Sequence, residues 1–512
     1  MKHNKLVRLL SLAMVLLMLV CCFAACGDKD DTKDPATTTN KPAGPAEDTE
    51  APLTGEELEY LPAEKDYKKR EIKIAAPSQQ AWGVGHFCHV DGSEDVINVA
   101  LHERELLLDD QYGIILTLDT NRNSTNILTQ IHKTASSQSS DYDLAFMITP
   151  DSMNAAMGGR LSNLLTMEAL NLEASYYDQR IQQDFKIDDL LFHVTGDFDL
   201  IDELVTMGVL YNDSIYKDLG LYDEKGTPYE MVRNYTWTYD VMWEMASRFT
   251  VNEDSVFDIN DKVGIVSENQ AGYYIFMGAG IRPINNNNGT LTIAFTDGTI
   301  KDRATTILET LMAYCANEDF CIPARDFASD APVRDAGANK DMFLGDRALF
   351  RTSSLSTTLN GMPDMASDFG ILPIPMYESA QKAYYCWLNG DANWPLAVPK
   401  FANKQAELAE IIEIFCYYSR YGGDESLYEA FFERLSLAKI CRKPDDRAMF
   451  ALIFESKVYD IDQALKLMNV WGAVQGFVGS KSTVSTSTLD GLMENAGTKL
   501  AGYVKQFQMM NQ

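Results

Sequence analysis

The sequence predicts an α/β fold with two or more lobes and a largely parallel sheet. Short apolar segments alternate with helical patterns from about residue 70 onward, which is typical of consecutive βαβ units. About 450 residues are expected to fold, too many for a single hydrophobic core. Residues 343–400 combine strand-like runs that stop at prolines with an aromatic loop, which is typical of a cleft wall.

The first part of the folded region has the clearest alternation of strands and helices. We expect strands at 71–76, 114–118 and 141–147, and helices at 96–112 and 125–136. The helix at 96–112 has apolar residues at helical spacing, and Gly113 is its stop signal. The strand at 141–147 is apolar enough to be buried on both faces, as in parallel sheets.

Further elements are expected later in the chain. Residues 241–249 have the pattern of an amphipathic helix, with Thr238 as its N-cap. The four asparagines at 285–288, followed by Gly289, predict a turn before a short strand at 290–295, and thus a hairpin. The run 343–350 predicts a strand that ends just before Arg351.

The N-terminus has the pattern of a signal peptide. Three cations are followed by an apolar run at residues 9–20, which is too short to span a bilayer comfortably. Residues 23–27, Phe-Ala-Ala-Cys-Gly, resemble the lipobox of bacterial lipoproteins. This resemblance implies cleavage of residues 1–25 and acylation of Cys26, with palmitate among the expected acyl chains. The alternative is an ordinary secretory signal in which Cys26 has no role.

Residues 26–69 have the composition of a disordered acidic tether. They are rich in Asp, Thr, Pro and Ala and bury too little apolar surface to offset the entropy of ordering. With lipid on Cys26, this segment would connect the folded part to the extracytoplasmic face of the bacterial cell membrane.

The charge balance excludes some partners. The chain has 44 Lys and Arg against 74 Asp and Glu, a net charge of −30. Nucleic acids attract basic surfaces, so we expect no nucleic-acid partner. After the leader and Cys26, six cysteines remain, and only Cys315 and Cys321 are close in sequence. An extracytoplasmic location permits a disulfide, but buried thiols are an equal alternative.

Several passages together resemble the extracellular solute-binding lipoproteins of ABC importers, family 1-like and of the carbohydrate type. Residues 141–164, DYDLAFMITPDSMNAAMGGRLSNL, resemble the family's third strand and the short helix that follows it. Residues 204–222 and 368–375 resemble strands that cross between lobes. Further similar passages follow in the family's order, at 235–240, 263–265, 343–350 and 404–418. Together these passages span about 300 residues behind the lipobox.

The resemblance implies a two-lobed, periplasmic-binding-protein-like fold of type II, with a ligand cleft between lobes joined by crossing strands. Lobe 1 would comprise residues 70–203 and 373–435, and lobe 2 residues 204–372 and 436–505. It implies a small-molecule ligand, most often a sugar or oligosaccharide, and the subunits of an ABC permease as partners. Hinge closure around the ligand would deliver it to the transporter.

Aromatic and polar side chains in loops at strand ends are the candidates for ligand contact, because sugars present flat C–H faces and hydroxyl groups. The candidates are Trp82, Phe87, Tyr273, Tyr274, Arg351, Trp387, Asn389, Asp391 and Trp394. For each aromatic the alternative is packing, and Trp237 at a helix start is more typical of packing. Asp391 is equally consistent with a solvated turn, and Arg351 with an ion pair.

Other classes of function have weaker signals. His86, Cys88, His89 and Asp91 are the one cluster of metal-ligand types, with His102 further along, but this spacing is a weak pattern for a transition metal. We expect no metal, no cofactor and no catalytic residues. The alternatives are a secreted, glycoside hydrolase-like enzyme acting on polysaccharide, whose carboxylate pair no motif identifies, and a sensory or adhesion role without a transporter.

Overall fold

The computed structural model of the chain describes residues 65–77, 87–93, 95–251, 260–267, 271–316, 321–323, 337–359, 362, 365–422, 426–480 and 484–510. All of them belong to the compact unit Leu53–Gln512; the other unit is Met1–Pro52. The predicted leader, Cys26, Trp82 and His86 lie outside the described residues. Tyr67, within the predicted tether, is buried, and its N–H donates to the carbonyl of Tyr112 at 2.7 Å.

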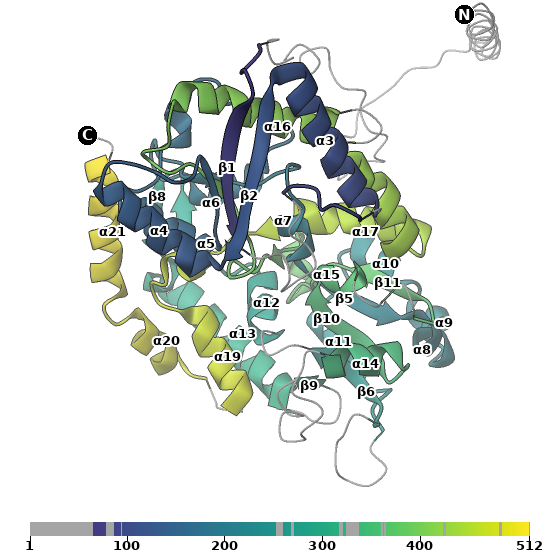
Figure 1. Cartoon of the computed structure of the whole chain (residues 1–512). Coiled ribbons are helices and arrows are strands. Elements are labelled where there is room, and N and C mark those ends of the chain that lie inside the picture. The colour runs from purple at the N-terminus through teal and green to yellow at the C-terminus, as the bar shows by residue number, and fades with distance from the viewer. Residues whose placement is uncertain are drawn as a thin grey trace, which may run out of the picture. The chain divides into compact units, whose positions relative to one another are not determined.

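The first sheet has the strand order β2-β1-β3-β13-β4. Its strands are β1 (Arg70–Pro77), β2 (Ile114–Arg122), β3 (Leu144–Phe146), β4 (His193–Val194) and β13 (Leu396–Ala397). β1 runs parallel to β2 and β3, whereas β13 is antiparallel to β3 and β4. Figure 1 shows β1 and β2 side by side. The predicted parallel arrangement is therefore confirmed at this sheet's start, and β13 joins it from a distant part of the chain.

Local signals determine the helices near this sheet. They include α3 (Val96–Tyr112), α4 (Ser124–Ser136), α5 (Thr149–Met157) and α16 (Gln405–Tyr421). Asp95 caps α3 by accepting from the N–H groups of its first turn, and Gly113 ends it with φ 61° in the left-handed region. The predicted helix at 96–112 and its stop signal are confirmed.

The second sheet has the strand order β11-β5-β10-β6-β9. Its strands are β5 (Met207–Asn212), β6 (Val263–Ser267), β9 (Cys321–Pro323), β10 (Ala348–Ser354) and β11 (Phe369–Leu372). β6 is parallel to β9 and β10, while β5 is antiparallel to its neighbours β10 and β11. The chain thus passes from the first sheet to the second between β4 and β5, and returns between β11 and β13.

Several helices lie near the second sheet, and one of them has different bounds from the helix predicted at 241–249. They include α8 (Asp213–Asp218), α9 (Leu221–Lys225), α10 (Pro228–Arg233), α11 (Tyr239–Ala246), α12 (Ala271–Gly278), α13 (Gly298–Ala316), α14 (Gly337–Leu344) and α15 (Ser356–Leu359). The helix predicted at 241–249 is α11, which begins two residues earlier and ends three earlier. Thr238 occupies its N-cap position without a side-chain cap bond.

The predicted hairpin is present, but its turn is shorter than expected. Asn285 to Asn287 belong to β7 (Ile284–Asn287), which pairs antiparallel with β8 (Thr290–Ile293). Asn288 and Gly289 alone make the turn, both with positive φ. The hairpin reaches α6 (Gln179–Phe185), because the amide of Asn286 donates to the carbonyls of Asp184 and Lys186 at 2.9 and 2.8 Å.

The C-terminal elements contact the second sheet, the β7–β8 hairpin and a helix beside the first sheet. They are η7 (Glu429–Ile440, with π-type hydrogen bonding), α17 (Pro444–Glu455), β14 (Lys457–Val458), α18 (Ile461–Leu465), α19 (Val470–Ser480), α20 (Thr486–Met493) and α21 (Ala496–Met510). β14 pairs in parallel with β12 (Cys386–Trp387). α17 packs on β11, α18 on α5, and α21 on both α5 and β8. No helix among the described residues is both long and apolar enough to cross a membrane.

Candidate functional site

The carboxyl ends of the parallel strands define the edges where a ligand is expected in open α/β sheets. In the first sheet β3 ends at Phe146, and in the second sheet β6 and β10 end at Ser267 and Ser354. The segment 387–394 contacts the chain beside both edges, as its hydrogen bonds show. We call this region the carboxyl-edge site.

Backbone hydrogen bonds fix the segment in place. Leu388 forms an isolated antiparallel β-bridge with Thr206, the residue that precedes β5. The carbonyl of Thr206 also accepts a hydrogen bond from the N–H of Leu355, just after β10. At the other sheet, the N–H of Thr149 at the start of α5 donates to the carbonyl of Gly390 at 3.0 Å. The segment is therefore anchored at both sheets, and its side chains have fixed positions.

Trp387 packs on the two tyrosines predicted with it. Its ring centroid lies 5.3 Å from that of Tyr273, edge to face, and 6.3 Å from that of Tyr274, in a stacked pair. All three side chains are fully buried. The indole Nε1 of Trp387 has no hydrogen-bond partner among the described residues, so one donor in this aromatic cluster is open to a further acceptor.

A second open polar atom lies on the adjacent strand end. The hydroxyl groups of Tyr274 and Thr352 are 3.1 Å apart, and Thr352 is paired in register with Ser267 at the end of β6. The Ser267 hydroxyl is buried and makes no hydrogen bond to any described residue. Buried polar atoms are normally satisfied, so this hydroxyl is a candidate contact for a polar ligand.

Asn389 and Asp391 are held by a residue that the sequence did not predict. The amide nitrogen of Gln463 on α18 donates to Oδ1 of Asn389 at 3.3 Å and to Oδ2 of Asp391 at 3.2 Å. Its amide oxygen accepts from the N–H of Gly390 at 3.1 Å. Burial raises the pKa of Asp391, and the hydrogen bond from Gln463 opposes that shift. Asp391 is half-buried, whereas Asn389 is buried.

Phe87 and Trp394 lie together against the first sheet. The Phe87 ring is 4.0 Å from that of Phe146 and 6.3 Å from that of Trp394. The carbonyl of Phe87 accepts from Nη2 of the buried Arg104 at 2.6 Å. Both aromatic rings are at most 5% exposed, so each is buried beside the carboxyl edge. Trp237, for which packing was expected, is also fully buried and donates to the carbonyl of Pro373.

Arg351 was expected to follow a strand, but it lies inside β10. Its backbone pairs with Leu210 of β5 on one side and Val266 of β6 on the other. The polar residues that follow it, Thr352 to Ser354, continue the strand because β5 supplies a partner at each position. Arg351 is 3% exposed and is thus a buried residue of the second sheet.

Two aspartates support this region from α18. The hydroxyl of Tyr273 donates to Oδ2 of Asp460 at 2.5 Å, and Asp460 accepts from the N–H of Asp462. Burial, and then the charge of Asp462, raises the pKa of Asp460 to about 7. Asp462 in turn accepts from the N–H groups of Met468 and Val470 where α19 begins. These carboxyl groups fix Tyr273, and through it Trp387.

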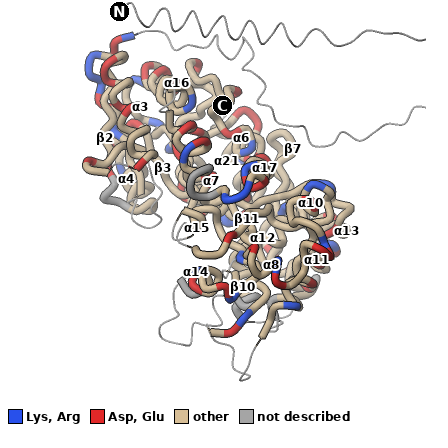
Figure 2. Tube along the Cα trace, turned by 90° about the vertical axis from the view of Figure 1, so that its right-hand side faces the viewer, with Lys and Arg blue, Asp and Glu red and all other residues tan. Residues whose placement is uncertain are grey.

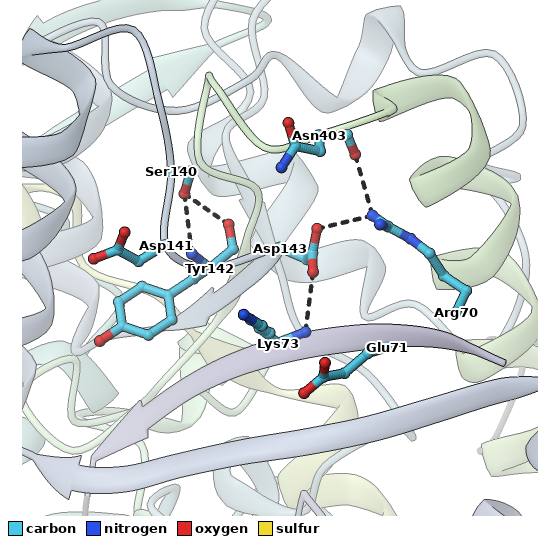
Figure 3. A pocket seen from close by; sticks show the side chains of 8 residues that line it. All are labelled: Arg70, Glu71, Lys73, Ser140, Asp141, Tyr142, Asp143 and Asn403. Carbon is cyan, nitrogen blue, oxygen red and sulfur yellow. Dashed lines mark hydrogen bonds and ion pairs between the residues drawn. The ribbon is translucent and has the colours of Figure 1, made fainter.

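A pocket of about 440 Å³ lies at the opposite edge of the first sheet (Figure 3). Nη2 of Arg70 donates to Oδ1 of Asp143 at 3.0 Å and to the carbonyl of Asn403, and Asp143 also accepts from the N–H of Lys73. Asp143 thus satisfies backbone and side-chain donors just before β3 begins. Because this pocket lies at the amino ends of β1 and β3, it is not the carboxyl-edge site.

The histidine cluster has a different arrangement from a metal site. Nδ1 of His89 is 2.8 Å from Oε2 of Glu105, and its ring centroid is 4.6 Å from that of His102. The hydrogen bond to Glu105 raises the pKa of His89. Within the described ranges, no group of three or more metal-binding side chains is arranged to hold a metal ion. Cys88, Cys386, Cys416 and Cys441 are free thiols; the side chains of Cys315 and Cys321 lie outside the description.

The residues that support the carboxyl-edge site have no signal of that role in the sequence. Gln463, Asp460 and Ser267 carry no motif, and their roles depend on contacts with residues far away in the chain. Asp460 precedes α18 as its N-cap, and this capping pattern is a local signal that identifies the helix start but not the bond to Tyr273.

Comparisons with known proteins identify the fold. No family model matches the chain, and no curated protein matches it either. Among solved structures, UspC of M. tuberculosis is 15% identical with a TM-score of 0.53, covering 83% of this chain and 99% of its own. UgpB from Mycobacterium tuberculosis in complex with glycerophosphocholine is 12% identical with a TM-score of 0.54, covering 85% and 99%.

A further neighbour is described as a substrate-binding protein. The ABC substrate-binding protein Lmo0181 from Listeria monocytogenes, in complex with cycloalternan, is 13% identical with a TM-score of 0.53 and covers 84% of this chain and 99% of its own. These identities are low, and the likeness extends over nearly the whole length of each neighbour. The chain therefore has the type II periplasmic-binding-protein fold, which both its strand order and its structural neighbours support.

Proposed function

We propose that this chain is a substrate-binding protein that delivers a carbohydrate to an ABC importer from the outer face of the cell membrane. The carboxyl-edge site carries the proposal, because Trp387, which stacks on Tyr274, and Ser267, which is in register with Thr352, have buried polar atoms that no described residue satisfies. Flat aromatic faces combined with open hydrogen-bonding groups are what a sugar ring requires.

The neighbours support a small polar ligand of this kind. Lmo0181 is described in complex with cycloalternan, a maltodextrin-binding protein with maltotetraose and UgpB with glycerophosphocholine. Two of these three ligands are oligosaccharides. The contact residues proposed here are Trp82, Phe87, Tyr273, Tyr274, Arg351, Trp387, Asn389, Asp391 and Trp394. Lobe closure would cover such residues, and a ligand stabilises the closed state only by its greater affinity for that state.

Anchoring and partners complete the proposal. Acylation of Cys26 would hold the protein at the membrane, and residues 26–69 would act as its tether. Lobes of 70–203 with 373–435 and 204–372 with 436–505 would close together and present a joint surface to the permease. Metabolic labelling with palmitate tests the anchor, since the Cys26→Ser variant should lose the label that the parent chain incorporates.

A thermal-shift screen of neutral oligosaccharides tests the binding function. We expect a saturable rise in melting temperature with one class of glycan, because a ligand that binds only the folded state stabilises it by mass action. Chromatography of the same mixtures should recover the glycan unchanged, and appearance of shortened products would refute a purely binding role.

The Trp394→Ala variant then locates the site. If Trp394 stacks on the sugar, the variant should lose about 1–3 kcal/mol of affinity, judged from the burial of an aromatic side chain. A lower melting temperature with unchanged affinity would show that Trp394 serves the core alone.

A further inference from the structure

A second groove, of about 360 Å³, lies beside β14 and the residues that lead into β12. Its lining combines cations and tyrosines, namely Arg180, Arg282, Lys382, Tyr235, Tyr384 and Tyr385. We call it the basic groove. It is formed by α6, by loops near the second sheet and by the segment 382–385, so it does not use the residues of the carboxyl-edge site.

The cations of the basic groove are incompletely neutralised. Nη1 of Arg282 is 4.0 Å from Oδ2 of Asp184 and 3.5 Å from the carbonyl of Tyr459, both at the limit of useful contact. A guanidinium has five N–H donors, so most of those on Arg282 remain available. The Arg180 side chain makes no hydrogen bond or ion pair with any described residue, and Lys382 only lies 5.7 Å above the ring of Tyr235.

The fourth cation of the lining is different. Nζ of Lys457 lies within 2.6 Å of carboxylate oxygens of both Asp178 and Asp202, so buried ion pairs neutralise its charge. Glu455 also lines the groove and offsets one charge. Asp184 is a second carboxylate beside both arginines, so the cations Arg180, Arg282 and Lys382 exceed the nearby carboxylates by one on a chain whose net charge is −30. Figure 2 shows basic and acidic residues interspersed along the chain.

The tyrosines supply flat faces next to the cations. Tyr235 and Tyr384 are stacked with ring centroids 6.0 Å apart and an interplanar angle of 12°. Tyr384 is fixed by donating its hydroxyl to the carbonyl of Val232 at 2.9 Å. Tyr235 and Tyr385 are only half-buried, and the guanidinium of Arg282 lies 5.7 Å from the Tyr385 centroid. A ligand ring placed against these faces would have its charged groups beside the cations.

We propose that the basic groove is a second ligand site, which binds a saccharide bearing carboxylate groups. Arginine binds carboxylates through paired N–H donors, and tyrosine faces pack against the C–H side of a sugar ring. The volume is in the range of pockets that hold small ligands. The lining shares no residue with the carboxyl-edge site, although the charge of Arg282 acts on Tyr273 there, and the proposal does not rest on the function proposed for that site.

Calorimetric titration of the full chain with trigalacturonate tests the proposal, with neutral maltotriose and sodium sulfate as comparisons. We expect trigalacturonate to bind at millimolar concentration or tighter and to weaken as NaCl is added. Arg282→Gln and the more exposed Arg180→Gln should each lower its affinity about tenfold or more, since each removes a charge-assisted hydrogen bond. Lys133→Gln, an exposed cation on α4, is the matched control and should change nothing.

Four results would overturn the proposal. They are no binding of trigalacturonate to the parent chain, wild-type affinity in both arginine variants, equal binding of maltotriose with the same sensitivity to those variants, and displacement of trigalacturonate by sulfate at equal charge. The Trp394→Ala variant keeps the two sites distinguishable. It should bind trigalacturonate like the parent chain whether or not the carboxyl-edge site binds a neutral sugar.

Discussion

The ammonium group of Lys457 lies 2.6 Å from Oδ2 of Asp202, although 255 residues separate the two in the chain. Asp178 and Glu203 approach the same nitrogen at 2.6 and 3.3 Å, and all four side chains are at most 8% exposed. Three carboxyl groups thus share one buried cation. Burial, and then the charge of Asp202, raises the pKa of Glu203 well above its ordinary value.

We expect Lys457→Met to destabilise the protein by about 3–5 kcal/mol at pH 7, because it leaves buried carboxylates without their cation. Urea denaturation of the variant and the parent chain at pH 7 measures the loss. The exposed Lys133→Met is the control, and an equal effect of the two substitutions would contradict the assignment.

Asp460 makes stability depend on pH. Its folded pKa of about 7 lies above the ordinary 3.8, so its contribution is fully present below about pH 3.8 and is lost as pH rises through 7. We expect the unfolding free energy of Asp460→Asn to fall less steeply between pH 4 and 7, by up to about 1.4 kcal/mol per pH unit. Denaturation curves across this range give the slopes, and parallel profiles for variant and parent would refute the expectation.

Gly289 allows the hairpin β7–β8 to approach the chain after α6. Its φ is +94°, and an added Cβ would lie 2.3 Å from the backbone nitrogen of Asp188. Gly289→Ala should therefore cost at least about 2 kcal/mol more than Gly220→Ala, where φ is +69° but the space is open. Thermal denaturation of both variants provides the comparison. Equal costs would mean that the contact with Asp188 relaxes easily.

Ser267→Ala separates binding from stability. Its hydroxyl makes no hydrogen bond to a described residue, so its removal should leave the melting temperature nearly unchanged. Affinity for the glycan found by the thermal-shift screen should fall by about 1 kcal/mol if that hydroxyl binds ligand. Ser152→Ala is the converse control, because the Ser152 hydroxyl contacts Nδ1 of His193 at 3.1 Å. Ser152→Ala should lower the melting temperature and leave the affinity for the glycan unchanged.

Elements with local signals were predictable from the sequence. Asp95 and Gly113 mark the two ends of α3 within a few residues of the helix itself, and the apolar run of β11 ends at Pro373. The order of motifs then predicted the type II fold, which the structure and its neighbours confirm. Trp387, Tyr273 and Tyr274 were selected separately, and the structure brings them together.

Features that depend on distant partners were not predictable. β4 and β13 are two residues long and exist because each pairs with the other, about 200 residues away. The apolar run ends at Phe350 and predicts Arg351 after the strand, yet pairing with β5 continues β10 to Ser354. Gln463 positions Asn389 and Asp391 without any pattern in its own neighbourhood.

The position of β13 late in the chain affects how the first sheet forms during synthesis. Leu396 and Ala397 join β3 to β4, so the first sheet stays in two pieces until the ribosome has made nearly 400 residues. At about 5–20 residues per second, the wait between β4 and β13 is on the order of ten to forty seconds. An incomplete chain therefore exposes open strand edges throughout this interval and requires protection from aggregation.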